Sequence, residues 1–307
     1  MTDRIDKNFK QAYLRENKDV IARHIEDSPF ISFLNSDKVI RGIYAERYFP
    51  ISVDENIIEK YWLLRQKAAL FDVPEKPIEI TGKDSEKFLD YIFCRDLSGI
   101  KIGRGYYCLA CTPKGGIFMD GILFMLETDR YWYVQADGQF ETWLLANSNG
   151  FNVNISNPHV WVLQIQGPAS TSVLKDASNN SLDESFGYYK SDFFDLGGQK
   201  IYVSRTGYTN ELGYELYCPS DTNHKALWDH LMKCGNSYGM EFSSTRAMTM
   251  RRIEGGIREN LVDMGTSVNP YDVGLGQFVN LDKENFIGKS SLCLLYTSPS
   301  PRDSGQS

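Results

Sequence analysis

The segment from Thr206 to Tyr217 combines two glycines with a carboxylate and a phenol in a short stretch. Gly207 and Gly213 bracket a predicted turn, and the strand that follows alternates its side chains between two faces. This alternation places Glu215 beside Tyr217 on one face. A carboxylate accepts two parallel N–H bonds, so the pair suits the amino-pyrimidone edge of a flat ring such as a pterin. A hairpin with a solvent-facing glutamate is the structural alternative.

A second candidate is Asp120, which interrupts an otherwise apolar strand between Met119 and Gly121. Burying a carboxylate there is costly unless it has a partner. An aspartate beside a reacting amine can accept its proton and stabilise developing positive charge. The alternative interpretation is a turn aspartate at the end of a strand.

Alternating strands and single helices must position these side chains. The segment 106–136 reads as a β-meander, because Gly115-Gly116 and Glu127-Thr128-Asp129 interrupt its apolar pattern. Helices are predicted from Asp54, from Asp84 or Ser85, through Phe140–Ala146, from Ala169 and through Asn223–Cys234. Meanders separated by single helices favour an α+β fold, with antiparallel sheets and flanking helices in two related subdomains.

Composition excludes several classes of function. The chain has 307 residues, a net charge of -7 and 33 scattered Lys and Arg residues, which argues against a nucleic-acid partner. The longest apolar runs, such as Ile122–Leu126, are far shorter than a membrane span. The N-terminus has no apolar stretch typical of a secretory signal, so we expect no membrane association and a cytoplasmic location.

Neither cysteines nor histidines indicate a metal site. The 6 cysteines are irregularly spaced, as expected of free thiols in a reducing compartment. Cys108 and Cys111 have C-x-x-C spacing, but residues three apart on a strand face opposite sides, which favours simple packing. Only His224 and His230 of the 4 histidines lie near one another in sequence, so no metal is expected.

Several motifs together resemble the glycine cleavage T-protein (aminomethyltransferase) superfamily. The most specific is Thr206–Glu215, which is similar to the family signature T-G-Y-T-G-E-x-G-Y/F-E. Further matching blocks occur in the family's order over about residues 55–292: Ala69–Val73, Gly115-Gly116 with Asp120, Gln166–Pro168, Arg252–Gly256 and Phe286–Lys289.

The resemblance implies tetrahydrofolate as the cofactor and assigns roles to particular residues. Glu215 matches the glutamate that holds the pterin edge, and Asp120 matches the aspartate near the reacting folate nitrogens, as the catalytic residue. Tyr107 aligns with a tyrosine lining the same site. Tyr217, beside Glu215, and Arg252, in its matching block, complete the predicted cofactor-binding set.

Departures from the family pattern bear on the substrate. Met248 stands where the family often has an arginine that meets the folate tail, with Arg246 and Arg251 as possible substitutes. Pro74-Glu75 replaces a common Ser-His pair. Other segments are similar to the dimethylsulfoniopropionate demethylase branch: Asp129–Trp132, Trp228–Leu231, Arg252–Gly256 and Asn269–Leu275.

Three regions are expected along the chain. Residues 1–50 are read as an N-terminal arm with an irregular entry, and residues 51–292 as the folate-binding domain. The segment 293–307 contains two prolines in three positions and no apolar period, so we interpret it as a non-native tail. The β-rich C-terminal domain of the family is then largely missing.

The sequence therefore predicts an enzyme that transfers a one-carbon unit, methyl or aminomethyl, from a small methylated amine or sulfonium compound to tetrahydrofolate. One alternative is a non-catalytic folate-binding protein of the same fold, acting in assembly or regulation. Another is a folate domain detached from a larger amine dehydrogenase. True glycine cleavage would further require a lipoyl carrier protein as partner.

Overall fold

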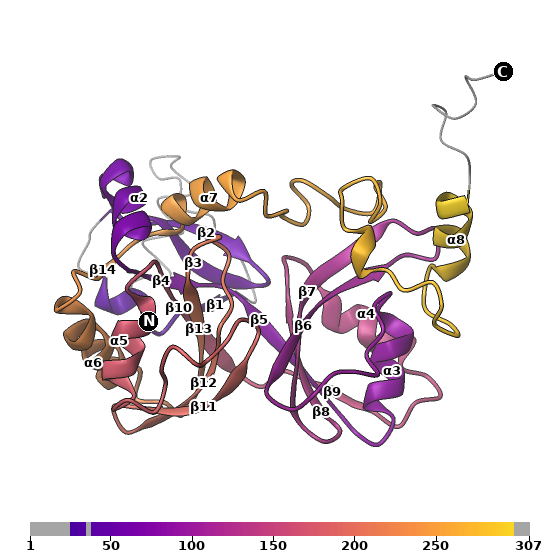
Figure 1. Cartoon of the computed structure of the whole chain (residues 1–307), viewed down its shortest axis with the longest axis horizontal. Coiled ribbons are helices and arrows are strands. Elements are labelled where there is room, and N and C mark those ends of the chain that lie inside the picture. Colours follow the sequence, from indigo (N-terminus) through magenta and orange to yellow (C-terminus); the bar gives the residue numbers. More distant parts are fainter. Residues whose placement is uncertain (1–24, 35–37, 298–307) are drawn as a thin grey trace, which may run out of the picture.

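The computed structural model describes residues 25–34 and 38–297 (Figure 1). Two β-sheets form the two halves of the molecule, with helices packed against their outer sides. The sheets are almost entirely antiparallel, and the predicted α+β class with flanking helices is confirmed. The chain crosses from one half to the other between neighbouring strands, so both halves share the loop around Glu75.

The five-stranded sheet has the order β6-β7-β8-β5-β9 and contains the predicted meander. Asp129, in the turn between β7 and β8, takes a positive φ of 59°, which suits a short polar side chain. The strands of this sheet are β5 (Lys76–Thr81), β6 (Arg104–Cys111), β7 (Ile117–Glu127), β8 (Arg130–Gln135) and β9 (Asn154–Ser156).

The six-stranded sheet has the order β11-β12-β13-β10-β4-β14, and only the short edge pair β14/β4 is parallel. Every residue of β4 is buried, as expected of a strand covered on both faces. The strands are β4 (Ala69–Val73), β10 (Val160–Gln166), β11 (Ser191–Leu196), β12 (Gln199–Ser204), β13 (Gly213–Pro219) and β14 (Glu241–Phe242).

All helices predicted from the sequence are present. The first begins slightly later than predicted, because Asp54 adopts a positive φ of 60° and Asn56 caps the helix through bonds from the main-chain N–H of Ile58 and Glu59. The helices are α2 (Ile57–Gln66), α3 (Ser85–Ile92), α4 (Phe140–Asn147), α5 (Ser170–Ala177), α6 (His224–Asn236), α7 (Thr245–Glu254) and α8 (Lys289–Thr297), with short 3-10 turns η1 (Ile31–Phe33) and η2 (Gly276–Phe278).

The N-terminal region differs from the irregular arm that the sequence predicts. Its described part forms a three-stranded sheet of β1 (Glu26–Asp27), β2 (Ile40–Tyr44) and β3 (Arg47–Ser52). A tight turn joins β2 to β3, with Ala45 and Glu46 both at positive φ. The prediction failed because neither turn residue is Gly, Asn or Asp, the usual signals of such a hairpin. Residues 1–24 lie outside the described part.

A long connection joins the two halves once more, after the crossings from β4 to β5 and from β9 to β10. Residues 255–288 leave α7 on one half, run along one edge of the molecule and reach α8 on the other (Figure 1). Helix α8 continues to Thr297, into the segment predicted as a tail, and residues 298–307 lie outside the described region. Among the described residues, no helix is long and apolar enough to cross a membrane.

An aromatic core holds the two halves together. Phe124 and Trp132 of the five-stranded sheet contact Tyr217 and Tyr202 of the six-stranded sheet, with ring centroids 5.8 Å and 5.5 Å apart respectively. Large rings contribute most to such interfaces because each buries much apolar area. The two sheets are therefore fixed relative to one another through this cluster of rings.

Candidate active site

A cavity of about 300 Å³ opens between the two sheets. Its walls come from β2, β6, β7, β8 and β13, from the loops around Glu75 and Gly207, and from the 255–288 connection. We call it the first cavity. It is lined by Tyr44, Glu75, Tyr107, Asp120, Gly121, Ile122, Val134, Gln135, Ala136, Tyr188, Tyr189, Gly207, Tyr208, Glu215, Gly256, Ile257, Arg258, Leu275 and Phe278.

Glu215 lies on β13 with its side chain held at the cavity wall. Its Oε2 accepts hydrogen bonds from the Tyr217 hydroxyl and the Thr206 hydroxyl, each at 2.7 Å. Its Oε1 accepts one bond of 3.0 Å from Gln164 Nε2, which leaves capacity for a further donor on that oxygen. Burial raises the pKa of Glu215, and the hydroxyl partners act against that rise. The carboxyl is thus fixed in orientation before any ligand arrives.

Asp120 lies inside β7 rather than in a turn at a strand end. Its Oδ2 accepts a 2.9 Å hydrogen bond from the Tyr107 hydroxyl. Its Oδ1 is buried and has no hydrogen-bond partner. Burial raises the pKa of Asp120 to about 6, although the Tyr107 bond favours the ionised form. A half-satisfied carboxylate at a cavity wall is poised to accept a proton from a ligand.

The two predicted tyrosines differ in position. Tyr107 lines the first cavity, and its ring contacts Phe278 edge-on with centroids 4.9 Å apart. Burial and the neighbouring Asp120 raise the Tyr107 pKa far above its ordinary value, so its hydroxyl remains a donor. Tyr217 is buried in the core between the sheets and is absent from the cavity lining. It acts on the cavity through its bond to Glu215.

Arg252 does not line the cavity. It is 5% exposed and lies at the end of α7, where its guanidinium contacts Glu259 at 2.5 Å, Asp263, and the Ile257 carbonyl at 3.3 Å. These contacts bend the chain after α7 so that the segment 256–258 faces the cavity. The structure therefore separates Arg252 from the other four predicted residues, and its direct contact with the cofactor stays a prediction.

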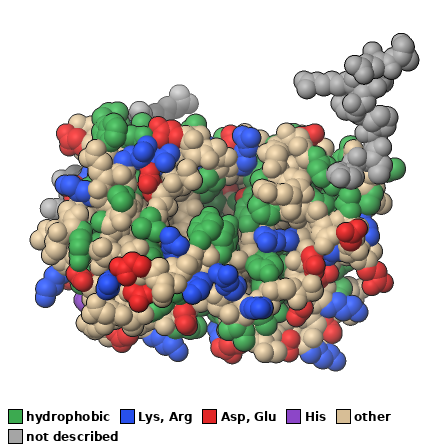
Figure 2. All heavy atoms as spheres, viewed as in Figure 1, with side chains coloured by type: hydrophobic (Ala, Val, Ile, Leu, Met, Phe, Trp, Pro, Cys, Tyr) green, Lys and Arg blue, Asp and Glu red, His purple; other side chains and the backbone are tan. Residues whose placement is uncertain are grey.

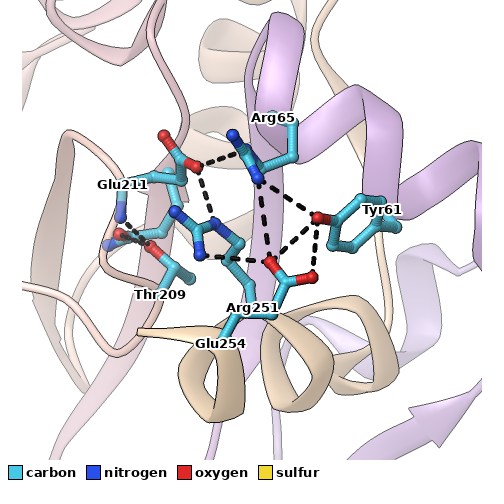
Figure 3. Close-up of polar contacts among 7 residues, drawn as sticks. Tyr61, Arg65, Thr209, Glu211, Arg251 and Glu254 are labelled. Atoms are coloured by element: carbon cyan, nitrogen blue, oxygen red, sulfur yellow. Dashed lines mark hydrogen bonds and ion pairs between the residues drawn. The ribbon is translucent and has the colours of Figure 1, made fainter. Parts of the chain in front are cut away.

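Arg251, a possible substitute for the missing family arginine, belongs to an ion-pair network outside the cavity (Figure 3). Glu211 accepts from both Arg251 at 2.7 Å and Arg65 at 2.8 Å. Glu254 bonds the Tyr61 hydroxyl and both arginines. The network ties α2, α7 and the loop before β13 together, so Arg251 has a structural role here. Arg246 is exposed and absent from the cavity lining.

The glycines of the 206–217 motif make room for the side chain of Gln166. A β-carbon at Gly213 or Gly207 would lie within 2.0 Å or 2.2 Å of the Gln166 amide. Gln166 in turn donates to the Thr206 carbonyl at 3.2 Å and accepts from the Thr209 hydroxyl at 2.8 Å. Two motif blocks that are distant in sequence therefore form one buried unit, which sets the loop from which Thr206 reaches Glu215.

Several cavity residues were not found by the sequence analysis. Glu75, noted only as a departure, lines the cavity and accepts a 3.1 Å bond from Gln164 Nε2, the same nitrogen that bonds Glu215. An acidic residue shortly after the largely apolar segment Ala69–Val73 was the available signal. The aromatic residues Tyr44, Tyr188, Tyr189, Tyr208 and Phe278 lie on loops or short strands whose placement no local pattern indicates.

The sequence also predicts that the cysteines are free thiols and that no metal is bound. Cys108 and Cys111 are buried free thiols, and burial raises the pKa of Cys108, as expected of packing residues. Within residues 25–34 and 38–297, no group of three or more His, Cys, Asp or Glu side chains could hold a metal ion. The ionisable side chains that line the first cavity are carboxyls, phenols and the guanidinium of Arg258.

The fold and the cavity define an α+β protein with a ligand site between two packed sheets. Residues 39–283 match the family described as the GCVT N-terminal domain, and the chain belongs to this family. It is 32% identical over 244 residues to an aminomethyltransferase of Caldanaerobacter subterraneus subsp. tengcongensis, covering 78% of this chain and 65% of the relative. An aminomethyltransferase of Alkaliphilus oremlandii is 32% identical over 246 residues, covering 78% and 66%.

A solved structure agrees with this membership. The glycine cleavage system aminomethyltransferase T from Bartonella henselae superposes with a TM-score of 0.79 at 25% identity, covering 90% of this chain and 76% of that one. The chain spans slightly less than two thirds of the length of the relatives named above, at 65% and 66%. The T-protein fold predicted from the motifs is confirmed.

Proposed function

We propose that this protein is a tetrahydrofolate-dependent one-carbon transferase that takes a methyl or aminomethyl group from a small amine or sulfonium donor. The observation that carries the proposal is the pairing of Glu215 and Asp120 in one aromatic-walled cavity. One carboxyl is oriented by four hydrogen-bond donors, and the other retains an unpartnered buried oxygen. Orientation and proton acceptance are the two functions that such a transfer requires.

The residues present fit a reduced pterin. Glu215 Oε1 can accept an N–H from the amino-pyrimidone edge, because only Gln164 bonds that oxygen. Tyr107, Tyr189 and Phe278 supply flat walls for the ring faces. The cavity of about 300 Å³ is within the usual range for small-molecule sites. We expect the folate to bind with its pterin edge toward β13 and its reacting nitrogens toward β7.

Asp120 would handle the proton of the reaction. When bound, the reduced folate supplies a nucleophilic nitrogen. Asp120 Oδ1, which lacks a partner, would be the atom suited to receive the proton that this nitrogen loses when the carbon–donor bond breaks and the donor leaves as a neutral amine or sulfide. The Tyr107 hydroxyl, 2.9 Å from Oδ2, keeps the carboxylate in place and stabilises its charge. Most Asp120 side chains would be ionised at neutral pH, since the pKa is about 6.

The donor class follows from the charge of the cavity and from the resemblance to the demethylase branch. Glu75, Asp120 and Glu215 face the cavity, whereas Arg258 is the one Lys or Arg among its described lining residues. Such acidic walls favour a cationic amine or sulfonium, because a nearby cation favours the ionised form of the carboxyls. A lipoyl carrier protein is the alternative means of delivery, so aminomethylated lipoamide belongs in any donor panel. The free thiols support a reducing, cytoplasmic location.

Calorimetry with tetrahydrofolate tests the proposal. Replacing Glu215 with Ala should abolish measurable binding, because it removes the acceptor for the pterin edge and for the Tyr217 and Thr206 hydroxyls. Glu184→Ala, at an exposed ion pair with Lys175, is the matched control and should bind like the wild type. Unchanged affinity in Glu215→Ala would remove that residue from the site. Folate binding without product from any donor would favour the non-catalytic alternative.

A further inference from the structure

A second cavity of about 240 Å³ adjoins the first. The two share Tyr44, Glu75, Asp120, Ala136, Tyr208 and Arg258, whereas Glu215 and Tyr107 line only the first. The remaining walls of the second cavity come from β3 of the N-terminal sheet, from the end of β4, from α7 and from the chain after α7. Phe49 and Ile51 give it an apolar side. The shared wall containing Asp120 is the place where groups from the two cavities would meet.

Glu75, in the wall that the two cavities share, has a carboxyl oxygen whose burial the proposed folate site does not explain. Its Oε1 accepts from Gln164, but its Oε2 is buried and has no partner. The main-chain carbonyl of Glu75, not its carboxylate, receives the 2.7 Å bond from Arg47. Burial, followed by the nearby charge of Glu215, raises the pKa of Glu75 to about 8. An orphaned carboxyl oxygen is costly in a folded protein, so we expect it to gain a partner when ligand binds.

The surroundings define what that partner would be. Arg258 is the one Lys or Arg among the described lining residues of the second cavity, while Glu75, Asp120 and Glu259 are its carboxyls. Glu259 is already paired with Arg252, but the side chains of Glu75 and Asp120 form no ion pair within the described part of the chain. Two buried acids beside apolar and phenolic groups form a site for a positively charged head that carries methyl groups.

We propose that the second cavity is the donor chamber and that Glu75 binds the cationic head of the donor there. The proposal rests on the function proposed above and deepens it, by assigning the two reactants to different cavities. The pterin would occupy the first cavity beside Glu215, and the donor would occupy the second, beside Phe49 and Ile51. Asp120, common to both, then lies where the one-carbon group passes between them.

Choline and its neutral isostere 3,3-dimethylbutan-1-ol test the charge requirement in the wild-type protein. The two probes have nearly the same shape, and only choline is cationic. In calorimetry with tetrahydrofolate present, choline should bind at least about tenfold more tightly than the neutral alcohol. Equal affinities, or preference for the alcohol, would overturn the proposal without any variant.

Glu75→Gln then identifies the residue. At pH 8.5, above the Glu75 pKa of about 8, the carboxyl is ionised, and the amide keeps its size and its bond with Gln164 but removes that charge. At this pH choline affinity should fall at least about tenfold, the affinity for the alcohol should not change, and tetrahydrofolate affinity should fall less than choline affinity, because Glu75 also lines the first cavity. A variant that loses tetrahydrofolate to the same extent as choline would place Glu75 in the pterin site and contradict the proposal. If the wild-type protein does not bind tetrahydrofolate, that result would contradict the proposed function instead.

Thr249→Phe tests whether choline binds in the second cavity. Thr249 is exposed on α7 and lines only the second cavity, so a larger ring there should fill that cavity and leave the first one open. Choline binding should be lost while tetrahydrofolate binding is retained. Ile253→Phe, on the same helix, 61% exposed and outside both cavities, is the matched control. Retained choline affinity in Thr249→Phe would place the cation elsewhere.

Discussion

The two carboxyl groups of the first cavity are held in opposite ways. Glu215 receives bonds from four side chains, so its geometry is determined before a ligand enters. Asp120 has one partner, Tyr107, and one vacant oxygen. A rigid acceptor suits recognition of a fixed donor pattern, whereas an incompletely paired acid suits proton transfer. The difference in hydrogen bonding therefore separates a binding role from a chemical one.

Asp120 should control the pH dependence of turnover. Its pKa is about 6, raised from 3.8 by burial, and the proton acceptor must be ionised. We therefore expect kcat/KM to rise with pH through about 6 and then to level. Asp120→Asn should lower kcat by about 10² or more, with little change in tetrahydrofolate affinity. Steady-state rates across pH 4.5 to 8 measure both effects, and an unaltered profile in the variant would exclude Asp120 as the base.

Glu75 should lower stability at alkaline pH. Its folded-state pKa is about 8 against an ordinary 4.5, so the folded protein binds more protons than the unfolded chain between these values. The free energy of unfolding then falls as pH rises through this interval. Glu75→Gln has no carboxyl to ionise, so at pH 8.5 the variant should be more stable than the wild type by on the order of 2 kcal/mol. Urea denaturation at pH 6 and pH 8.5 measures the free energy of unfolding of both proteins. If this free energy falls equally in both between the two pH values, Glu75 is not the group responsible.

Residue-level prediction succeeded where a local pattern determined the face of a strand. Alternation along β13 correctly placed Glu215 beside Tyr217, now joined by a 2.7 Å bond. The same reasoning could not show that Tyr217 points into the core and Glu215 reaches the cavity edge, because both are determined by the packing of two sheets. Arg252 illustrates the other limit, since its acidic partners at 259 and 263 are set by a loop without periodicity.

At the scale of elements, the loop before β13 is fixed from two sides. Gln166, at the end of β10, fills the space that Gly207 and Gly213 leave open. On the outside, Glu211 joins that loop to Arg65 of α2 and Arg251 of α7 (Figure 3). The motif is therefore a structural requirement for holding Thr206 against Glu215, in addition to any contact with ligand.

Gly213→Ala tests this requirement. The new methyl group would meet the Gln166 amide 2.0 Å away, so Gln166 must move and give up its bonds to Thr206 and Thr209. We expect a loss of about 2 kcal/mol in the free energy of unfolding and weaker tetrahydrofolate binding. Gly265→Ala is the control, because a β-carbon there has nothing within 4 Å. Similar stability in both variants, measured by urea denaturation, would show that the contact is unimportant.

Strands and turns were predicted correctly where the sequence contains strong local turn signals. The meander from β6 to β8 was predicted because its turns contain Gly115-Gly116 and Asp129, and each strand is long. The hairpin of β2 and β3 was missed, since Ala45 and Glu46 give no sign of positive φ. That hairpin supplies Tyr44, Phe49 and Ile51 to the cavities, so the omission also concealed the second cavity.

At the scale of the whole molecule, the site exists only where the two halves meet. The first cavity takes Glu215 from one sheet and Asp120 from the other, and the 255–288 connection contributes Phe278. Contacts of this kind join residues far apart in sequence, so no local pattern could predict the cavity. On the face shown in Figure 2, Lys and Arg side chains are interspersed with Asp and Glu.

Because both halves line the cavity, tetrahydrofolate should stabilise both together. At a concentration 100 times its dissociation constant, the ligand should raise the free energy of unfolding by about 2.7 kcal/mol. Amide hydrogen exchange should slow in β6, β7 and β13 and in the segment 256–258, each of which lines the cavity. Helix α3, Ser85–Ile92, lies outside the cavity lining and should exchange at an unchanged local rate. Protection confined to one sheet would mean that the ligand does not bridge Glu215 and Asp120, since a pterin held between them must restrain the strands that carry both.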